Sequence, residues 1–178
     1  MQSVEIIFWF IFITFLVLIL GTFALAGISA APWVPLWKKD IKRMLDLAQV
    51  KPGEKVVDLG AGDGRIIIMA AKNYGANSLG YEFAVLPYFL AYIKILVNGV
   101  WGQARLKYRN FFKEDLSSAD VVCTFLSPQA MEKLKPKFEK EIKPGGRIVS
   151  YAFFVPGWEP TIKDKPNKKT TSIYLYQR

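Results

Sequence analysis

The sequence contains no histidine and a single cysteine, Cys123. The absence of histidine excludes imidazole metal sites, the Ser-His-Asp and Cys-His nucleophile systems, and a histidine general base. One cysteine cannot form an internal disulfide, and it provides no spacing of thiols that would hold zinc. We therefore expect a chemistry that uses neither imidazole nor a metal ion.

Basic residues are absent from the first 37 positions, where Glu5 is the only charged side chain. The other 141 residues carry all 24 basic and 14 acidic side chains. Residues 6–28 form an uncharged, strongly apolar run, and a helix of that length reaches ~35 Å, enough to cross a hydrocarbon core of ~30 Å. The sequence predicts an N-terminal transmembrane anchor over residues 1–31 and one further domain over residues 32–178.

A secretory signal peptide is the alternative for this apolar run, because small residues at 29–31 are suited to cleavage by a peptidase. No basic residue precedes the run, and it is longer than the ~7 to 15 apolar residues of such peptides, so an uncleaved anchor is favoured. Lys38 and Lys39 follow the run, and the positive-inside rule then places the domain on the cytoplasmic side of the membrane. The unpaired Cys123 agrees with a reducing compartment.

The basic surplus of the domain permits two interpretations. Basic side chains beside a bilayer are attracted to anionic head groups, at ~1 kcal/mol each near the surface. Nucleic-acid binding would need interleaved basic and aromatic residues on one face, or a known recognition module, and the sequence offers neither. The lysines between positions 133 and 143 are interspersed with glutamates, which is typical of a solvated helix surface. We expect no nucleic-acid partner.

Helical and strand-like patterns alternate after Pro35. The spacing predicts helices over 38–49, 64–73, 86–98 and 129–142, and strands over 55–59, 78–81, 106–109, 119–126 and 147–154. A hairpin is expected between 161–162 and 171–176. Together these elements predict an α/β fold with a Rossmann-like, mostly parallel sheet covered on both faces, an antiparallel C-terminal hairpin at its edge, and one preceding transmembrane helix.

A glycine-rich loop follows the first predicted strand, and residues 56–65 read Val-Val-Asp-Leu-Gly-Ala-Gly-Asp-Gly-Arg. Ligands of open α/β sheets bind at the carboxyl ends of the strands. A dinucleotide site would need a third glycine where Arg65 stands. The carboxylates of Asp58 and Asp63 would also repel a pyrophosphate, whereas they suit a cofactor with a cationic amino-acid end and no phosphate. The loop therefore predicts a site for S-adenosylmethionine.

Glu82 ends the second predicted strand, 18 residues after Gly64. A carboxylate at this position can accept hydrogen bonds from both hydroxyls of a ribose. Glycines at 60, 62 and 64 let the backbone approach a ligand and adopt positive φ angles. A glycine turn beside a surface acid is the plain structural alternative, and the combination with Asp58 favours the cofactor site.

Several segments resemble known methyltransferases. Residues 54–72 are similar to motif I of the seven-strand (class I) methyltransferases, and Lys-Pro-Gly-Gly-Arg at 143–147 resembles the turn before their fifth strand. Pro-Trp-Val-Pro at 32–35, residues 58–68, Asn-Phe-Phe at 110–112, Leu-Lys-Pro-Lys at 134–137 and Gly-Trp-Glu-Pro at 157–160 resemble the small protein-lysine methyltransferases. That family includes the broad-specificity archaeal enzyme and the mitochondrial methyltransferases of the ATP synthase c-ring protein and the adenine nucleotide translocase. The mitochondrial members share an N-terminal hydrophobic segment with this chain.

The resemblance implies roles for individual residues. The methionine end of the cofactor would be lined by the loop residues Asp58, Gly60, Ala61, Gly62, Asp63 and Gly64. Glu82 would bind the ribose, and the adenine would lie against Asn110 and Phe111. The segment formed by Trp33, Val34 and Pro35 would fold over the cofactor. This chain departs from the polar pairs usual in the family at 36–37 and at 83–84, which leaves the rim of the pocket undefined.

The activity implied is protein-lysine N-methylation, with a substrate in or near the membrane because the anchor concentrates the domain there. Ser127 and Gln129 follow the fourth predicted strand and are candidates for positioning the substrate, and Trp158 is a candidate for a cation–π wall of the lysine channel. An ordinary helix start at Ser127 and plain packing of Trp158 are the alternatives. A membrane-anchored methyltransferase of a lipid, quinone or other small molecule, and a non-catalytic cofactor-binding module, also remain open.

Overall fold

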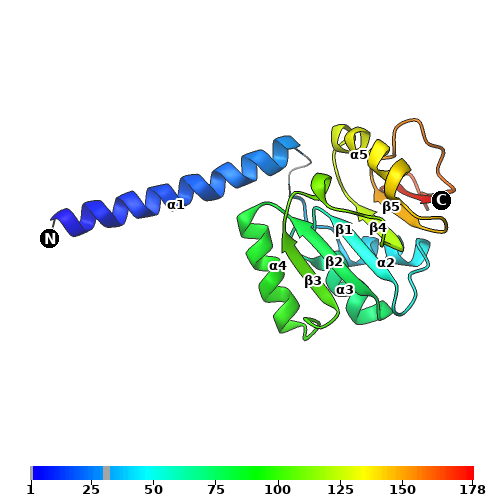
Figure 1. The fold of residues 1–178 in the computed structure, drawn as a ribbon, viewed down its shortest axis with the longest axis horizontal. Coiled ribbons are helices and arrows are strands. Elements are labelled where there is room, and N and C mark those ends of the chain that lie inside the picture. Colours follow the sequence, from blue (N-terminus) through cyan, green and yellow to red (C-terminus); the bar gives the residue numbers. More distant parts are fainter. Residues whose placement is uncertain (1, 30–32) are drawn as a thin grey trace.

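The computed structural model describes residues 2–29 and 33–178. A long helix, α1 (Gln2–Ser29), extends away from an α/β domain (Figure 1). Along the domain follow α2 (Lys38–Leu47), β1 (Lys55–Leu59), α3 (Arg65–Tyr74), β2 (Asn77–Glu82), α4 (Val85–Val97), β3 (Ala104–Tyr108), a 3₁₀ turn η1 (Phe111–Lys113), β4 (Val121–Thr124), α5 (Pro128–Glu141), β5 (Arg147–Tyr151), β6 (Ile162–Asp164) and β7 (Ile173–Gln177). Every helix and strand expected from the sequence is confirmed, most of them with shifted ends, whereas η1 was not expected.

The sheet has seven strands in the order β3-β2-β1-β4-β5-β7-β6. β1 to β5 are parallel to their neighbours, and β7 pairs antiparallel with both β5 and β6. The predicted mostly parallel sheet with an antiparallel C-terminal pair is therefore confirmed. The chain leaves β1 toward β2 and later returns to the other side of β1 as β4, so the strand order reverses between β1 and β4. In such sheets ligands bind at the carboxyl ends of these two strands.

Helices cover both faces of the sheet. Because neighbouring strand residues point to opposite faces, Val56 packs in a cluster with Met44 of α2, while Val57 packs in another with Phe138 of α5. A third cluster joins α3 and β3 to Ile95 of α4. α2, α3 and α4 thus lie on one side and α5 on the other, and the buried sheet between them fixes the strand ends that carry the candidate site.

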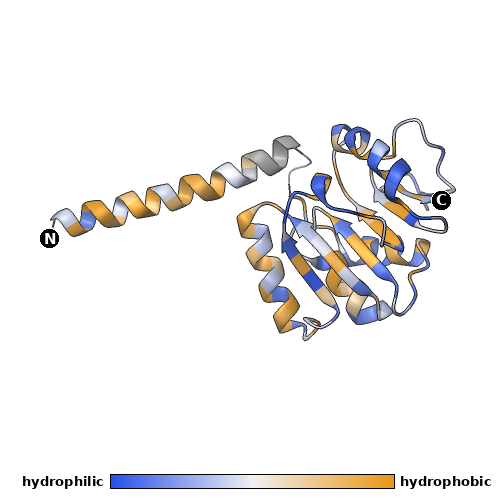
Figure 2. Cartoon of the chain, viewed as in Figure 1, coloured by the Kyte–Doolittle hydropathy of each residue, from blue (hydrophilic) through white to orange (hydrophobic). Residues whose placement is uncertain are grey.

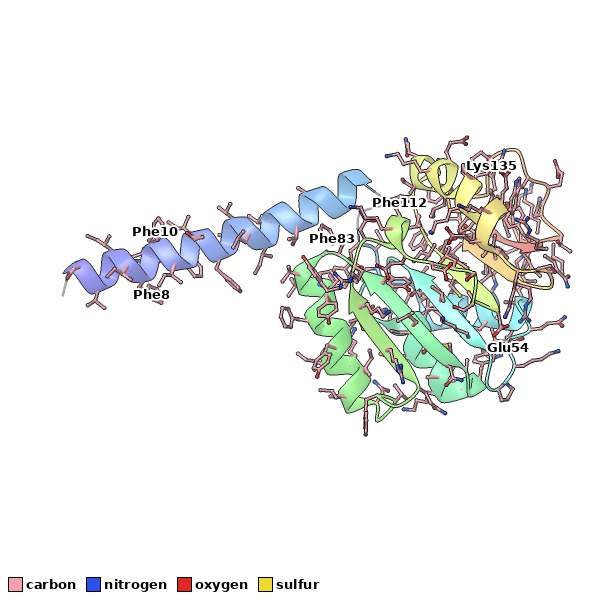
Figure 3. The ribbon with its side chains drawn as sticks, in the orientation of Figure 1. Phe8, Phe10, Glu54, Phe83, Phe112 and Lys135 are labelled. Carbon is pink, nitrogen blue, oxygen red and sulfur yellow. The ribbon has the colours of Figure 1, made fainter. Side chains whose placement is uncertain are left out.

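Helix α1 is apolar on all sides (Figure 2). The window Ser3–Thr22 is, within the described residues, the one helical stretch long and apolar enough to cross a membrane, and none of it is buried in the protein. Phe8 and Phe10 point away from α1 on opposite sides (Figure 3). Near the C-terminal end of α1, the Val85 N–H of α4 donates to Thr22 Oγ1 at 3.4 Å. A helix that is apolar all round is stable when lipid or protein surrounds it.

Candidate active site

The glycine loop turns the chain from the end of β1 into α3. The N–H groups of Gly60 and Ala61 both donate to the Tyr81 carbonyl, at 3.0 and 2.9 Å, which ties the loop to the end of β2. Gly60 and Gly62 have φ angles of +81° and +55°, in the left-handed region that side-chain-bearing residues rarely adopt. The sequence predicted glycines in this turn, and its positive φ angles explain why glycine is needed there.

Glu82 joins the loop to the end of β2. Its Oε2 accepts a hydrogen bond from the Gly62 N–H at 2.7 Å, and its Oε1 accepts from the N–H groups of Phe83 and Ala84 at 2.8 and 2.7 Å. A carboxylate has about four acceptor positions, so the three backbone bonds leave about one for a ligand. The predicted bonds from two ribose hydroxyls would therefore have to share positions with the backbone bonds.

Asp58 is a buried carboxylate in β1, only 2% exposed. No donor among the described residues hydrogen-bonds to it, and burial together with the nearby charges of Glu82 and Asp63 raises its pKa to about 8. An unpaired buried carboxylate is unfavourable, and a cationic partner would relieve that cost. The cationic amino-acid end of S-adenosylmethionine has the charge that this position lacks, so the residue fits the cofactor.

Asp63 differs from Asp58 because the protein neutralises it. Its carboxylate accepts from Arg65 Nε at 2.8 Å and from the Lys94 ammonium group of α4. The Arg65 Nη1 in turn donates to the Leu36 carbonyl at 2.9 Å. Asp63 therefore holds α3, α4 and the segment before α2 together, and its predicted contact with the cofactor would come in addition to these bonds.

The segment around Trp33 crosses the loop. A Cβ added to Gly62 would lie 2.7 Å from the Trp33 indole ring, so this ring rests directly on the loop backbone. Val34 and Pro35 continue into the wall of a neighbouring cavity. The structure thus places the three residues beside the loop, and their contact with the cofactor stays a prediction.

Asn110 and Phe111, which follow β3 at the start of η1, also lie next to the loop. Asn110 caps η1, because its Oδ1 accepts from the Phe112 N–H at 3.1 Å. The Phe111 ring is 3.9 Å from the position that a Cβ of Gly60 would occupy, and it is buried with its ring tilted against Phe112 at 4.5 Å between centroids. η1 is what turns the chain after β3 toward the loop, where the adenine is predicted to bind.

A cavity of about 470 Å³ opens at the carboxyl ends of β4 and β5. Its wall is mostly apolar and is formed by Val34, Pro35, Leu36, Trp37, Phe125, Leu126, Ser127, Tyr151, Ala152, Phe153 and Thr171. Ser127 caps α5, with its Oγ accepting from the Ala130 N–H at 3.3 Å, so the expected helix start is confirmed and the same residue faces the cavity. The Tyr151 hydroxyl donates to Asp40 at 3.3 Å.

The other two candidate substrate residues lie outside this wall. Gln129 is exposed on the first turn of α5. Trp158 packs edge-on against Tyr176, with ring centroids 5.8 Å apart, and its Nε1–H donates to Glu139 at 3.3 Å. These contacts give Trp158 a packing partner on β7, whereas Ser127 alone among the three lines the cavity.

Gly80 is a site residue that the sequence patterns did not predict. It lies in β2, and an added Cβ would be 2.6 Å from the Ala61 Cβ and 3.0 Å from the Ile67 Cδ1. A glycine inside a strand signals such a close approach, and this one lets the loop pack against the sheet.

We expect Gly80→Ala to destabilise the protein by about 1–3 kcal/mol, because the added methyl group overpacks this contact. Gly102→Ala is the matched control, since no atom lies within 4 Å of its added Cβ. The free energies of unfolding in urea measure the difference. Equal losses in the two variants would show that the contact between β2 and the loop is not tight.

Comparison with known proteins shows the family of the chain. The family model for the ANTKMT methyltransferase domain matches residues 58–162. A protein-lysine N-methyltransferase of Saccharolobus islandicus is 44% identical over 148 residues, which cover 82% of this chain and 92% of that protein. The Homo sapiens lysine N-methyltransferase of the ATP synthase C subunit is 33% identical over 129 residues, and the chain spans 54% of its length.

Solved structures agree with this relationship. An RNA methyltransferase from Salinibacter ruber, in complex with S-adenosyl-L-homocysteine, has a TM-score of 0.77 and 32% identity, covering 80% of this chain and 92% of that one. A SAM-dependent methyltransferase from Geobacter sulfurreducens, with a TM-score of 0.59 and 18% identity, covers 66% of this chain and 49% of that one and shares the fold. The glycine loop, the buried Asp58 and these similarities lead to one conclusion: the chain belongs to the ANTKMT methyltransferase family, with the class I fold and S-adenosylmethionine as its methyl donor.

Proposed function

We propose that this protein is a protein-lysine N-methyltransferase. The observation that carries the proposal is its 44% identity to the Saccharolobus islandicus enzyme across 92% of that enzyme's length. The geometry supports it, because Asp58, a carboxyl group with no partner among the described residues, directly precedes the glycine loop. The loop in turn borders the apolar cavity, since a Cβ added to Gly60 would lie 3.2 Å from Leu126 of the cavity wall. The proposal includes the cofactor contacts expected from the sequence, of which Trp33 is the first along the chain and Phe111 the last.

The reaction is an in-line displacement in which a C–N bond forms as a C–S bond breaks. S-adenosylmethionine, when bound, supplies the electrophilic methyl group. A lysine amine attacks only when neutral, and an apolar wall of the kind around Phe125 and Phe153 lowers the pKa of an amine that it surrounds. Ser127, in the cavity wall, would accept a hydrogen bond from that amine, and the released proton would pass to water because the sequence has no histidine to take it.

The rim of the cavity is open to large substrates. Val34 is 54% exposed and Trp37 is 72% exposed, while Phe153 continues the same exposed border. A macromolecule can rest on such a rim and insert one long side chain. This favours a lysine on a protein surface over a small molecule that a closed site would surround.

The proposal includes attachment to a membrane. Residues 1–31 would form the anchor and residues 32–178 the catalytic domain, on the cytoplasmic side, because Lys38 and Lys39 follow the apolar helix. The substrate would then be a membrane protein, or a protein whose lysine comes close to the membrane surface, since anchoring raises the local concentration of both partners.

The test is methylation of native fractions. The full chain in detergent, with methyl-labelled S-adenosylmethionine, should label proteins of its own membranes, and acid hydrolysis should release the label as methyl-lysine. The Asp58→Asn variant is the inactive control. Label found only in the lipid extract would instead indicate a small-molecule methyltransferase, and cofactor binding without any labelling would indicate a non-catalytic module.

RNA methylation is the second candidate. The Salinibacter ruber protein, described as an RNA methyltransferase, is 32% identical over most of both chains. The same reaction supplied with total RNA distinguishes the two functions. Label that ribonuclease removes and protease does not would replace the lysine proposal.

A further inference from the structure

Helix α4 exposes an unusual amount of apolar surface. Six of its thirteen residues are large, apolar and 42–80% exposed: Leu86, Phe89, Tyr92, Ile93, Leu96 and Val97. Their spacing of one and three residues puts them on one side of the helix, while Ala91 and Ile95 are buried on the other. Lys94 is the only charged residue of α4, so the helix is apolar on its outer and inner sides alike (Figure 2).

Aromatic residues extend this surface beyond the helix. Phe83 stacks on Tyr108 of β3 at 5.4 Å between ring centroids, and each is 39% exposed. Trp101, after α4, is 72% exposed. We call these three residues and the six of α4 the α4 patch. Contiguous apolar surfaces of this kind on a soluble face indicate an interaction site.

The chain segment that carries the α4 patch has a positive net charge. Residues 83–113 contain five basic residues and no acidic one. Ala104 and Leu106 of β3 pack toward α3 and α4, so the side chains of Arg105 and Lys107 point to the other face of this edge strand. Both are exposed, with no ion pair in the described part of the chain. A protein partner with an apolar surface does not require this surplus, whereas an anionic lipid surface attracts it.

Helix α1 relates the patch to a membrane. α4 forms the edge of the domain on the side from which α1 departs, and it runs across the direction of α1 (Figure 1). The hydrogen bond from Val85 to Thr22 joins the start of α4 to the end of the membrane-spanning window. At ~1.5 Å per residue α4 reaches only ~20 Å, too short to cross a bilayer, so it would lie along the surface that α1 penetrates.

We propose that the α4 patch is a second membrane contact, buried in the interfacial layer of an anionic bilayer. Its aromatic side chains occupy the head-group level, its aliphatic ones reach the acyl chains, and the surplus positive charge of residues 83–113, Arg105 and Lys107 included, attracts the anionic surface. This inference rests on the proposed anchoring by α1. The domain is then held against the bilayer in one orientation instead of swinging on a tether.

Site-specific labels test the contact in the full chain. Cys123 is fully buried, so a thiol reagent should modify only an introduced cysteine. Val97→Cys places an environment-sensitive fluorophore in the α4 patch, Phe12→Cys places it in α1, and Lys168→Cys places it on the exposed turn between β6 and β7. In nanodiscs containing anionic lipid, spin-labelled lipids should quench the labels at 97 and 12 several-fold more than the label at 168.

Each outcome decides a different point. Quenching at 12 with none at 97 overturns the α4 contact and leaves the anchor intact. Quenching at 97 with none at 12 supports the contact and overturns the anchor. A label at 97 that shifts to the blue without quenching by lipid shows that protein, such as a second copy of the chain, covers the patch, which also overturns the proposal.

A paired variant tests the charge. Arg105→Gln with Lys107→Gln should reduce quenching at 97 in anionic nanodiscs but not in nanodiscs of neutral lipid. Lys163→Gln with Lys168→Gln, on the terminal hairpin, is the matched control and should leave quenching unchanged. Equal effects of the two pairs would exclude a specific attraction between the lipid and the positive charge of residues 83–113. Retained binding of S-adenosylmethionine shows that the variants are folded.

Discussion

Asp58→Asn is expected to weaken the binding of S-adenosylmethionine by at least about 100-fold, equivalent to ~2.7 kcal/mol. Asparagine keeps the shape of the side chain but cannot ionise, whereas the Asp58 carboxyl, which has no partner among the described residues, can lose its proton when a cation binds beside it. The cationic end of the cofactor then loses its counter-charge inside a buried site, where such a pairing is strongest. Isothermal titration calorimetry measures the loss.

The same variant should be more stable than the parent protein without cofactor, and the gain should depend on pH. The folded state binds the Asp58 proton more tightly than the unfolded state, with a pKa of about 8 against an ordinary value of 3.8. The contribution of Asp58 to stability is therefore fully present below about pH 4 and is lost as the pH rises toward 8. Asp58→Asn removes this loss.

Asp115 provides the control for the pH effect. It is exposed, and hydrogen bonds from Ser117 lower its pKa, so Asp115→Asn should leave the fall in stability between pH 5 and pH 8 as it is in the parent. Unfolding in urea at several pH values gives the curves. A parent protein whose stability does not fall over this range would show that Asp58 is ionised at no penalty.

Glu82→Gln is expected to have the second large effect, a destabilisation of about 1–3 kcal/mol together with loss of cofactor binding. The carboxylate accepts three backbone N–H groups, whereas an amide presents one oxygen and one NH₂ group. At least one buried N–H is then left without an acceptor, and each such group costs about 1–3 kcal/mol. Thermal unfolding of the cofactor-free protein measures the effect.

Glu159→Gln is the matched control, because Glu159 is exposed on the chain between β5 and β6. It should change stability by less than about 0.5 kcal/mol. If Glu82→Gln lost cofactor binding with unchanged stability, Glu82 would act on the ribose alone and would not hold the loop.

The fold could be predicted in detail where the signal is local. The strand at 55–59 matches β1, since a short apolar run before a glycine turn defines both of its ends. The strand predicted to reach residue 126 ends at Thr124, because Phe125 and Leu126 leave the sheet to line the cavity. The strand predicted to reach residue 154 ends at Tyr151, where Ala152 adopts a φ of +69°. Both strand ends are determined by the way the folded chain forms the cavity. No local sequence pattern predicts where the strands end for that reason.

The candidate site was predictable as a set of residues but not as a set of contacts. Asp58 and Asp63 look equivalent in the sequence, as two acids beside glycines. The structure separates them, because Lys94 from a distant helix neutralises Asp63, while Asp58 has no partner among the described residues. Trp158, on the connection between β5 and β6, has its main partner, Tyr176, on β7. Pairings between elements far apart in sequence follow from the folded sheet and leave no periodic signal.

The short connection between α1 and the glycine loop limits how far the cofactor site can lie from a membrane that α1 spans. Only residues 30–32 lie between α1 and Trp33, which rests on Gly62. From Thr22 to Trp33 the chain can reach at most ~25 Å, with a helical part followed by an extended one. With α1 in a bilayer, the methyl donor is therefore held close above the membrane, and a lysine on a tall extramembrane domain stays out of range. Substrates would then be selected first by the distance between their lysine and the membrane surface, and only afterwards by the residues around that lysine.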